Sequence, residues 1–165
     1  VNNAGIVKFE PFEEITDETW DRIYEVNVKG TFIVTQVTLP DMKAAKWGRI
    51  INISSSSAQT GAVTLAHYSS SKGAIVTLTR TLAQELGPHG ITVNNVPPGS
   101  VMQTQMSEAN KKVMPIDEET LLKTLPVRRT GVPNDIANAV AWLASEETSY
   151  VTGQTISVNG GRVVT

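Results

Sequence analysis

A tyrosine and a lysine four residues apart, Tyr68 and Lys72, carry the clearest chemical signal in this sequence. A tyrosine phenol loses its proton near pH ~10, which is too high for efficient proton transfer at neutral pH. A cation about 4 Å away, in a medium with an effective dielectric of about 20, stabilises the phenolate by about 4 kcal/mol. Lowering the phenol pKa by two to three units needs only about 3–4 kcal/mol. The pair could therefore make Tyr68 a general acid and base, although the same spacing alone also fits a surface Tyr–Lys contact.

A helix must hold this pair, because residues four apart share a face of a helix. Apolar residues from Ile75 to Leu86 recur at helical spacing, and Gly87-Pro88 follows them as a stop signal. We therefore predict a helix over Ala66–Leu86 that projects the phenol and the ammonium into the same space. His67, which directly precedes the tyrosine, is interpreted as a surface or packing residue that could also touch a substrate.

Four consecutive serines, Ser54–Ser57, begin at the end of the predicted strand Arg49–Ser54, which is apolar enough to be covered on both faces. Polar groups at the carboxyl end of a parallel strand lie where open α/β sheets bind ligands. Ser55 lies 13 residues before Tyr68 and is the candidate site residue of this segment. Ser54 and Ser56 could also reach the same cleft.

Asn27 lies 28 residues before Ser55, inside a second predicted helix that begins at Thr16 or Asp17 and continues toward Lys46. Asparagine is mildly unfavourable in the interior of a helix, so a polar residue there suggests a specific partner. Pro40 is expected to bend this helix or to end its first part.

The rest of the chain alternates short β-branched segments with longer amphipathic ones, a pattern typical of a parallel α/β sheet. The remaining strands are predicted over Val1–Ala4, Ile91–Val96 and Thr155–Val158. The segment 101–124 is expected to be a mobile loop with short helices, and another helix is expected to begin at Asn134 or Asp135. We predict a single α/β domain over residues 1–165.

Composition argues against several functions. The formal charge is −2, from 14 Lys and Arg against 16 Asp and Glu, which gives no electrostatic footprint for nucleic acid or an acidic membrane. The absence of Cys excludes disulfides, thiolate metal sites and a Cys nucleophile. Asp41, Glu85 and Asp135 lack an obvious carboxylate or His partner, so no metal site is expected. With no signal peptide and no long apolar run, a cytoplasmic location is expected.

Together these positions resemble the pattern of the short-chain dehydrogenase/reductase family. The matching motifs are Asn3-Ala4-Gly5, Asn27, Ser55, Tyr68-x-x-x-Lys72, Pro98-Gly99, Tyr150-Val-Thr-Gly153-Gln154 and Val158-Asn159-Gly160-Gly161. The resemblance runs the full length of the chain and is greatest to 3-oxoacyl-thioester reductases and small alcohol or polyol dehydrogenases. It implies the C-terminal part of a doubly wound, Rossmann-type parallel sheet. It also implies an oxidoreductase that transfers a hydride between NAD or NADP and an alcohol or carbonyl substrate.

The resemblance assigns a role to each candidate residue. Tyr68 would exchange the hydroxyl proton, and Lys72 would lower the Tyr68 pKa and bind the nicotinamide ribose. Ser55 would donate a hydrogen bond to the substrate oxygen, and Asn27 would hold a water that links Lys72 to solvent. Further cofactor contacts are implied for Asn3, Ala4, Gly5, Pro98, Gly99, Val101 and Thr104. Thr104 stands one position later than the Thr usual in the family.

The glycine-rich turn with which this family binds the cofactor pyrophosphate does not occur in the sequence. We therefore expect the chain to begin within the fourth strand of the family fold and to be a fragment. A central strand without its neighbour exposes backbone and apolar faces, so these residues alone should aggregate or need a partner, with negligible cofactor affinity. The resemblance implies a homodimer or homotetramer formed through the long helices and the last strand. A truncated, non-catalytic interaction or scaffold subunit is the alternative.

Overall fold

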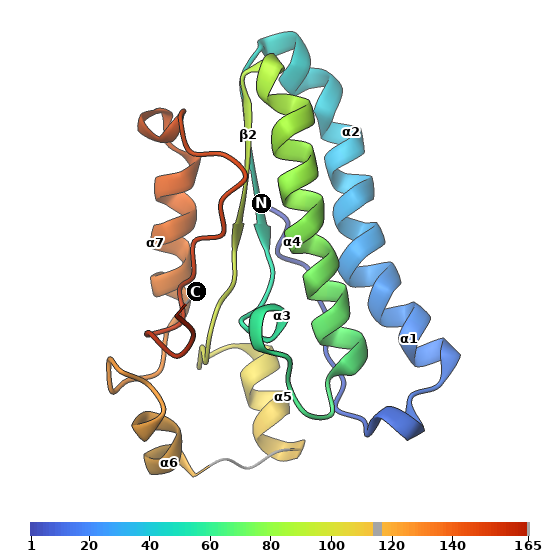
Figure 1. Ribbon diagram of the computed structural model, residues 1–165, viewed down its shortest axis with the longest axis vertical. Helices are drawn as coiled ribbons and strands as arrows, with labels where there is room; N and C mark the ends of the chain where they lie inside the picture. The colour runs from blue at the N-terminus through green and yellow to red at the C-terminus, as the bar shows by residue number, and fades with distance from the viewer. Residues whose placement is uncertain (114–116, 165) are drawn as a thin grey trace.

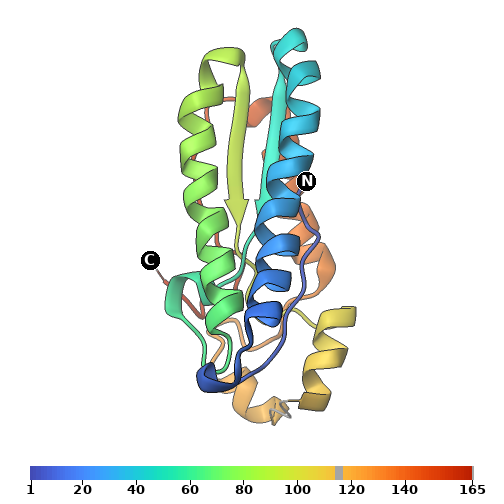
Figure 2. The same ribbon diagram turned by 90° about the vertical axis from the view of Figure 1, so that its right-hand side faces the viewer.

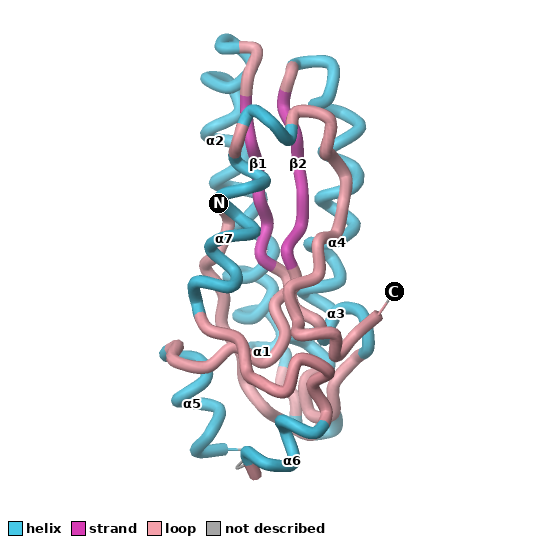
Figure 3. The backbone as a smooth tube through the Cα atoms, turned by 90° about the vertical axis from the view of Figure 1, so that its left-hand side faces the viewer, coloured by secondary structure: helices cyan, strands magenta, loops and turns pink. Residues whose placement is uncertain are grey.

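Two parallel strands form the centre of the structure, a computed structural model that describes residues 1–113 and 117–164. β1 spans Gly48–Ile53 and β2 spans Ile91–Val96, and the two pair in register along their whole length. Figure 3 shows them side by side, and their pairing is parallel. The bounds of β2 are those predicted, and β1 lies one residue earlier than predicted.

Each edge of this pair is extended by a segment that hydrogen-bonds to it without forming a regular strand. Asn2 donates its backbone N–H to β1 at 2.9 Å and accepts one from β1 at 3.0 Å. On the other edge, parallel bridges join Asn95 to Thr155 and Pro98 to Val158. The predicted strands Val1–Ala4 and Thr155–Val158 are therefore in place in a parallel arrangement but reduced to isolated bridges.

Helices cover both faces of the sheet, as Figure 1 shows. α2 (Gly30–Ala45) and α4 (Ala66–Leu86) lie on one face, and α7 (Pro133–Ala144) lies on the other. Because successive strand side chains point to opposite faces, neighbouring residues enter different cores. Ile50 packs with Leu86 of α4, whereas Ile51 packs with Leu143 of α7. This two-sided burial confirms the α/β fold class.

The helix predicted from Thr16 or Asp17 toward Lys46 is one continuous helical path with a change of winding. It consists of α1 (Asp17–Tyr24), a π-helical turn (Glu25–Lys29) and α2. The Thr16 side chain caps α1 by accepting from the backbone N–H of Thr19 at 3.2 Å. Pro40 lies inside α2, which continues to Ala45, so the expectation that Pro40 could end the helix is wrong.

Shorter helices complete the chain. They are α3 (Ser57–Thr60), α5 (Gln105–Val113) and α6 (Glu118–Lys123), with 3-10 turns at Phe12–Glu14, Gly87–His89 and Glu146–Thr148. Short helices were predicted for 101–124, of which 114–116 lie outside the described residues; the mobility of this segment stays a prediction. None of the described helices is both long and apolar enough to cross a membrane.

α7 begins at Pro133, one residue before the earlier of the two predicted starts. Proline suits the first helical position because its missing N–H would lack a partner there in any case. The Asp135 carboxylate accepts from the backbone N–H of Val132 at 2.9 Å, which fixes the start of the helix. Asp135 therefore lies inside the first turn of α7 and stabilises it, instead of standing at the start of the helix.

The loops that follow the parallel segments gather at one edge of the sheet, toward which both strand arrows point in Figure 2. Ser56, after β1, donates its backbone N–H to the carbonyl of Pro98, after β2, at 2.9 Å. Gly99 lies so close to Asn159 that an added Cβ would stand 2.7 Å from the Cα of Asn159. Only glycine fits at position 99 without displacing backbone. The loop after β2 can therefore approach the segment around Asn159 closely, at the edge where such sheets bind ligands.

Candidate active site

Tyr68 and Lys72 lie together in the first turns of α4, at the carboxyl edge of the sheet. Tyr68 is 8% exposed and Lys72 is 4% exposed. The Lys72 Nζ lies 5.9 Å from the centre of the Tyr68 ring. The structure thus brings the two side chains onto one buried face, as the four-residue spacing predicted, and rules out the surface Tyr–Lys contact.

Burial shifts the pKa of both groups toward their uncharged forms. It raises the pKa of Tyr68 above its usual value of 10.0, and a hydrogen bond with Ser55 opposes that rise. It also lowers the pKa of Lys72 from 10.5 to about 8. The expected depression of the Tyr68 pKa by Lys72 is therefore not the direction found in this structure. The burial that brings the pair together also removes the water that would solvate a phenolate.

The Lys72 ammonium has few partners for a buried cation. Its Nζ donates to the carbonyl of Ile53, at the end of β1, at 3.0 Å. Within the described parts of the chain this is its only hydrogen bond, although an ammonium carries three donors. A Cβ added to Gly5 would lie 3.1 Å from the Nζ, so the absence of a side chain at position 5 leaves room for the ammonium.

Of the three serines that could reach the cleft, Ser55 is the one whose side chain lowers the Tyr68 pKa against the effect of burial. Its Oγ accepts from the backbone N–H of Ser57 at 3.2 Å and from the Ser57 hydroxyl at 3.0 Å. These bonds orient the Ser55 hydroxyl and leave its own proton free to be donated. The Ser54 Oγ is buried and has no hydrogen-bond partner among the described residues.

Asn27 lies in the π-helical turn and is 1% exposed. Its side chain accepts from the backbone N–H of Ile6 at 2.9 Å and donates to the Ile6 carbonyl at 3.1 Å and the Ser71 hydroxyl at 3.0 Å. Ser71 in turn donates to the carbonyl of Tyr68 at 2.7 Å. Asn27 therefore ties the N-terminal loop to the helix that carries Tyr68. Sequence reasoning found the residue but not the π turn, a distortion frequent at functional sites. Its role toward a bound water stays a prediction.

The residues predicted to contact the cofactor are distributed around this edge. Asn3 and Ala4 are exposed, Gly5 lies beside Lys72, and Pro98, Gly99 and Val101 are half-buried after β2. The Thr104 hydroxyl accepts from the backbone N–H of Ser107 at 3.0 Å, so within this chain it stabilises the start of α5. These cofactor contacts stay predictions.

Two features of the site fit a hydroxyl-rich ligand such as the ribose of a nicotinamide cofactor. The Lys72 ammonium has donors beyond its bond to Ile53, and the buried Ser54 hydroxyl has no partner within residues 1–113 and 117–164. Buried polar atoms without partners carry an energetic cost, and a ligand oxygen would remove it. Lys72 would hold the ribose, with Ser54 able to reach the same ligand.

Sequence reasoning missed the surroundings of His67. The residue is 0% exposed, so of its two interpretations the packing one is correct and the surface one is wrong. Its Nε2 lies 3.3 Å from a carboxylate oxygen of Glu10, which is 57 residues away in the chain. No spacing rule connects residues that far apart, and no other signal in the sequence points to the contact.

Known proteins match this chain along almost its whole length. Residues 1–162 match the family model described as enoyl-(acyl carrier protein) reductase. The 3-oxoacyl-(acyl-carrier-protein) reductase of Rickettsia felis is 38% identical over 164 residues, covering 99% of this chain and 66% of that protein. The acetoacetyl-CoA reductase of Cupriavidus necator is 37% identical over 161 residues, covering 98% of this chain and 64% of that protein.

A solved structure from Agrobacterium tumefaciens, described as a candidate gluconate dehydrogenase, superposes with a TM-score of 0.92 at 31% identity. The match covers 98% of this chain and 63% of that one. The chain thus spans about two thirds of the length of the relatives it matches. The shared fold, the family model and the arrangement around Tyr68 lead to one conclusion: the chain belongs to the short-chain dehydrogenase/reductase family.

Proposed function

We propose that the protein is an NAD- or NADP-dependent oxidoreductase that reduces a carbonyl to an alcohol, with Tyr68 as the proton donor. The observation that carries this proposal is the burial of Tyr68 and Lys72 on one helix face, with the Ser55 side chain acting on the Tyr68 pKa. These three residues lie at the carboxyl edge of a parallel sheet, where ligands of such folds bind.

The protonation state of Tyr68 supports reduction as the favoured direction at neutral pH. Reduction of a carbonyl requires a protonated phenol at the outset, because the phenol gives its proton to the forming alkoxide. Burial raises the Tyr68 pKa, so the phenol holds its proton at neutral pH. Oxidation requires the opposite state, and we expect it to become efficient only at higher pH.

Lys72 and Ser55 would stabilise the charges that appear during this transfer. The bound nicotinamide supplies the hydride. The Lys72 pKa of about 8 leaves the ammonium mostly charged at neutral pH, where it offsets the negative charge left on Tyr68. The Ser55 hydroxyl donates toward the carbonyl oxygen, on which negative charge develops. In a buried site both interactions are stronger than they would be in water.

A 3-oxoacyl thioester is the substrate class that we propose. Two of the relatives reported above are named as reductases of such thioesters. Val101, Met102 and Met106, in the loop after β2 and in α5, are apolar and only partly buried, which would suit an acyl chain. The solved structure described as a gluconate dehydrogenase makes a polyol the substrate class to compare.

We also propose that the protein assembles as a homodimer or homotetramer through α2 and α4. Phe32, Ile33, Val34 and Val37 of α2 are exposed large apolar residues on neighbouring turns. A cluster of exposed apolar side chains of this kind marks an interaction surface more often than a surface that stays in contact with solvent.

A substrate screen with both cofactors tests the proposed function. The protein that carries this chain would be incubated with acetoacetyl-CoA or with gluconate and its oxidised form, each with NAD(H) and NADP(H), and turnover followed by nicotinamide absorbance. We expect reduction of acetoacetyl-CoA to be the fastest reaction. Cofactor binding without turnover of any carbonyl or alcohol would contradict the proposal, and faster turnover of gluconate would replace the substrate class.

A further inference from the structure

The helix that carries Tyr68 begins without an ordinary side-chain cap. α4 starts at Ala66, and Leu65 at the N-cap position accepts no hydrogen bond through its apolar side chain. The first backbone N–H groups of a helix have no partner within it. Tyr68 supplies one of them, and it donates to the Nδ1 of His67 at 3.0 Å. The ring of His67 thus satisfies the backbone of the tyrosine itself.

Glu10 fixes this ring from the other side. Because Nδ1 accepts the Tyr68 N–H, the ring proton belongs on Nε2, which lies 3.3 Å from the Glu10 carboxylate and donates to it. The backbone N–H of Glu10 donates to the carbonyl of Thr64 at 3.0 Å, just before α4. Glu10 is therefore held next to the start of α4 by its backbone, through Thr64, and by its side chain, through His67.

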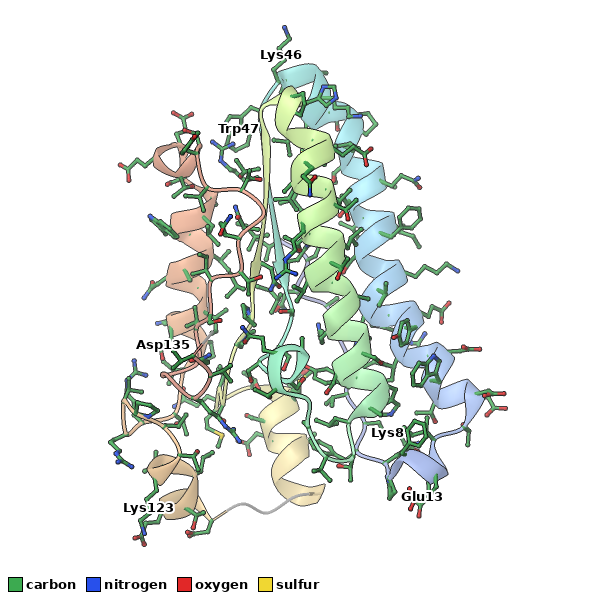
Figure 4. All side chains as sticks on the ribbon, viewed as in Figure 1. Lys8, Glu13, Lys46, Trp47, Lys123 and Asp135 are labelled. Atoms are coloured by element: carbon green, nitrogen blue, oxygen red, sulfur yellow. The ribbon has the colours of Figure 1, made fainter. Side chains whose placement is uncertain are left out.

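Lys8 completes the chain of contacts. Its Nζ lies 2.6 Å from the second Glu10 oxygen and 3.4 Å from the Thr19 hydroxyl of α1. Figure 4 labels Lys8 between the start of α4 and α1. The Lys8 hydrogen bond is the largest influence that holds the pKa of Glu10 below its usual value, so the carboxylate stays ionised at neutral pH. A negative charge near a helix N-terminus is also favoured by the helix dipole.

We infer that His67 and Glu10 are positioning residues, which hold the first turn of α4 so that the Tyr68 phenol faces Ser55 and Lys72. The inference rests on the proposed function, since it assigns the contacts a catalytic purpose. His67 binds the N–H of Tyr68, and Glu10 acts through the His67 ring, while Ser71 binds the Tyr68 carbonyl. A misplacement of about 1 Å can lower a rate by about 100-fold, so a constraint on the backbone of the proton donor affects turnover directly.

Two substitutions of His67 separate positioning from packing. His67→Asn keeps an acceptor where Nδ1 lies, whereas His67→Gln keeps a group that can reach Glu10 but leaves the Tyr68 N–H without an acceptor. We expect His67→Gln to lower kcat about tenfold or more at nearly unchanged KM. We expect the separate variant His67→Asn to keep kcat within about threefold of that of the unmodified protein. The matched control is His89→Asn, at an exposed turn, which should change neither constant. An unchanged kcat in His67→Gln, or equal losses in both His67 variants, would overturn the inference.

A nitrogen NMR measurement on the unmodified protein tests the His67 tautomer without depending on turnover, and the Glu10→Ala variant adds a test of the Nε2 contact. We expect the His67 ring to carry its proton on Nε2 with Nδ1 hydrogen-bonded, and Glu10→Ala to weaken the Nε2 hydrogen bond. A proton on Nδ1 would overturn the inference even in an active enzyme. The expected tautomer in a protein that reduces no carbonyl would instead confirm the contact and overturn the proposed function, so the two failures are distinguishable.

Discussion

Two cations in different regions of the molecule have opposite surroundings. Lys72 lies in the candidate active site, and Arg129 lies in the loop just before α7. Arg129 is 60% exposed and donates two hydrogen bonds to Asp135, at 2.7 and 2.9 Å. Lys72 is buried, and among the described residues no carboxylate forms an ion pair with it. Asp135 raises the pKa of Arg129, and Arg129 in turn holds the pKa of Asp135 at about 2, whereas burial lowers the Lys72 pKa to about 8.

The difference separates a structural charge from a functional one. A paired, partly solvated ion such as Arg129 fixes a loop at little cost, and Figure 4 labels its partner Asp135 at the lower end of α7. A buried cation without a countercharge is costly to the fold. Such a cost is expected where the charge serves a ligand or a reaction, because functional sites depart from the arrangement that is most stable.

The largest effect that this comparison predicts is for Lys72→Met. We expect kcat to fall by about 100-fold, because the charge left on Tyr68 loses its stabilising cation. We also expect the free energy of unfolding at pH 7 to rise by up to about 3 kcal/mol, because the burial penalty of the ammonium disappears. Kinetic assays and denaturant titrations check the two parts.

The pH dependence of this stabilisation follows from the sign of the shift. The Lys72 pKa is about 8 in the folded state and 10.5 as its reference value. Below pH ~8 the lysine is charged in both states and the penalty is complete; it is lost as the pH rises toward 10.5. The stability gain of the Met variant should shrink over the same interval. Lys43→Met, on the exposed side of α2, is the control. A Met variant less stable than the original at pH 7 would contradict the prediction.

A smaller effect is expected for Asn27→Ala, which removes the link between the N-terminal loop and α4. The substitution removes the hydrogen bonds of the partly buried Ile6 backbone groups with Asn27, and the one that the Ser71 hydroxyl accepts from it. We expect the free energy of unfolding to fall by about 2–3 kcal/mol, measured by denaturant titration. Asn138→Ala, on an exposed position of α7, should change it little. Equal effects of the two substitutions would show that the buried amide is not part of the framework of the site.

The smallest effect is expected for Asp135→Asn, which weakens the ion pair with Arg129 at the start of α7. We expect a modest loss of thermal stability and an unchanged kcat, because this pair fixes α7 rather than the site. The Asp135 pKa is lowered from 3.8 to about 2, so its contribution is complete above pH ~4 and is lost as the pH falls toward 2. Thermal melts of both proteins should therefore converge at acid pH. A fall in kcat as large as that of Lys72→Met would remove the distinction between the two cations.

The central elements could be predicted from the sequence because local signals agreed there. α4 and β2 have the predicted bounds, since helical apolar spacing ends at Gly87-Pro88 in one case and a strand rich in β-branched residues ends before Pro97 in the other. The segments at the sheet edges were harder to predict: Val1–Ala4 was predicted to be a strand, but it forms only an isolated bridge. Pro40 has a strong breaking tendency that the surrounding helix overrides.

At the site, spacing identified the chemistry-bearing residues but not their energetics. The four-residue spacing placed Tyr68 and Lys72 on one face, yet the direction of the Tyr68 pKa depends on burial, which the spacing does not report. The contact between Glu10 and His67 joins a loop to a helix and exists only after the chain has folded. The partner of Asp135 was missed for a related reason: a search for carboxylates and histidines did not consider Arg129.

The most direct test of the account is the rate of carbonyl reduction by Tyr68→Phe in the protein that carries this chain. Phenylalanine keeps the ring and removes only the hydroxyl, and Tyr150→Phe, at a fully exposed position, is the matched control. We predict a fall in kcat of about 1,000-fold for Tyr68→Phe with cofactor affinity preserved, and no change for the control. A Tyr68→Phe protein that retains more than about a tenth of the original kcat would contradict the assignment of the phenol as the proton donor.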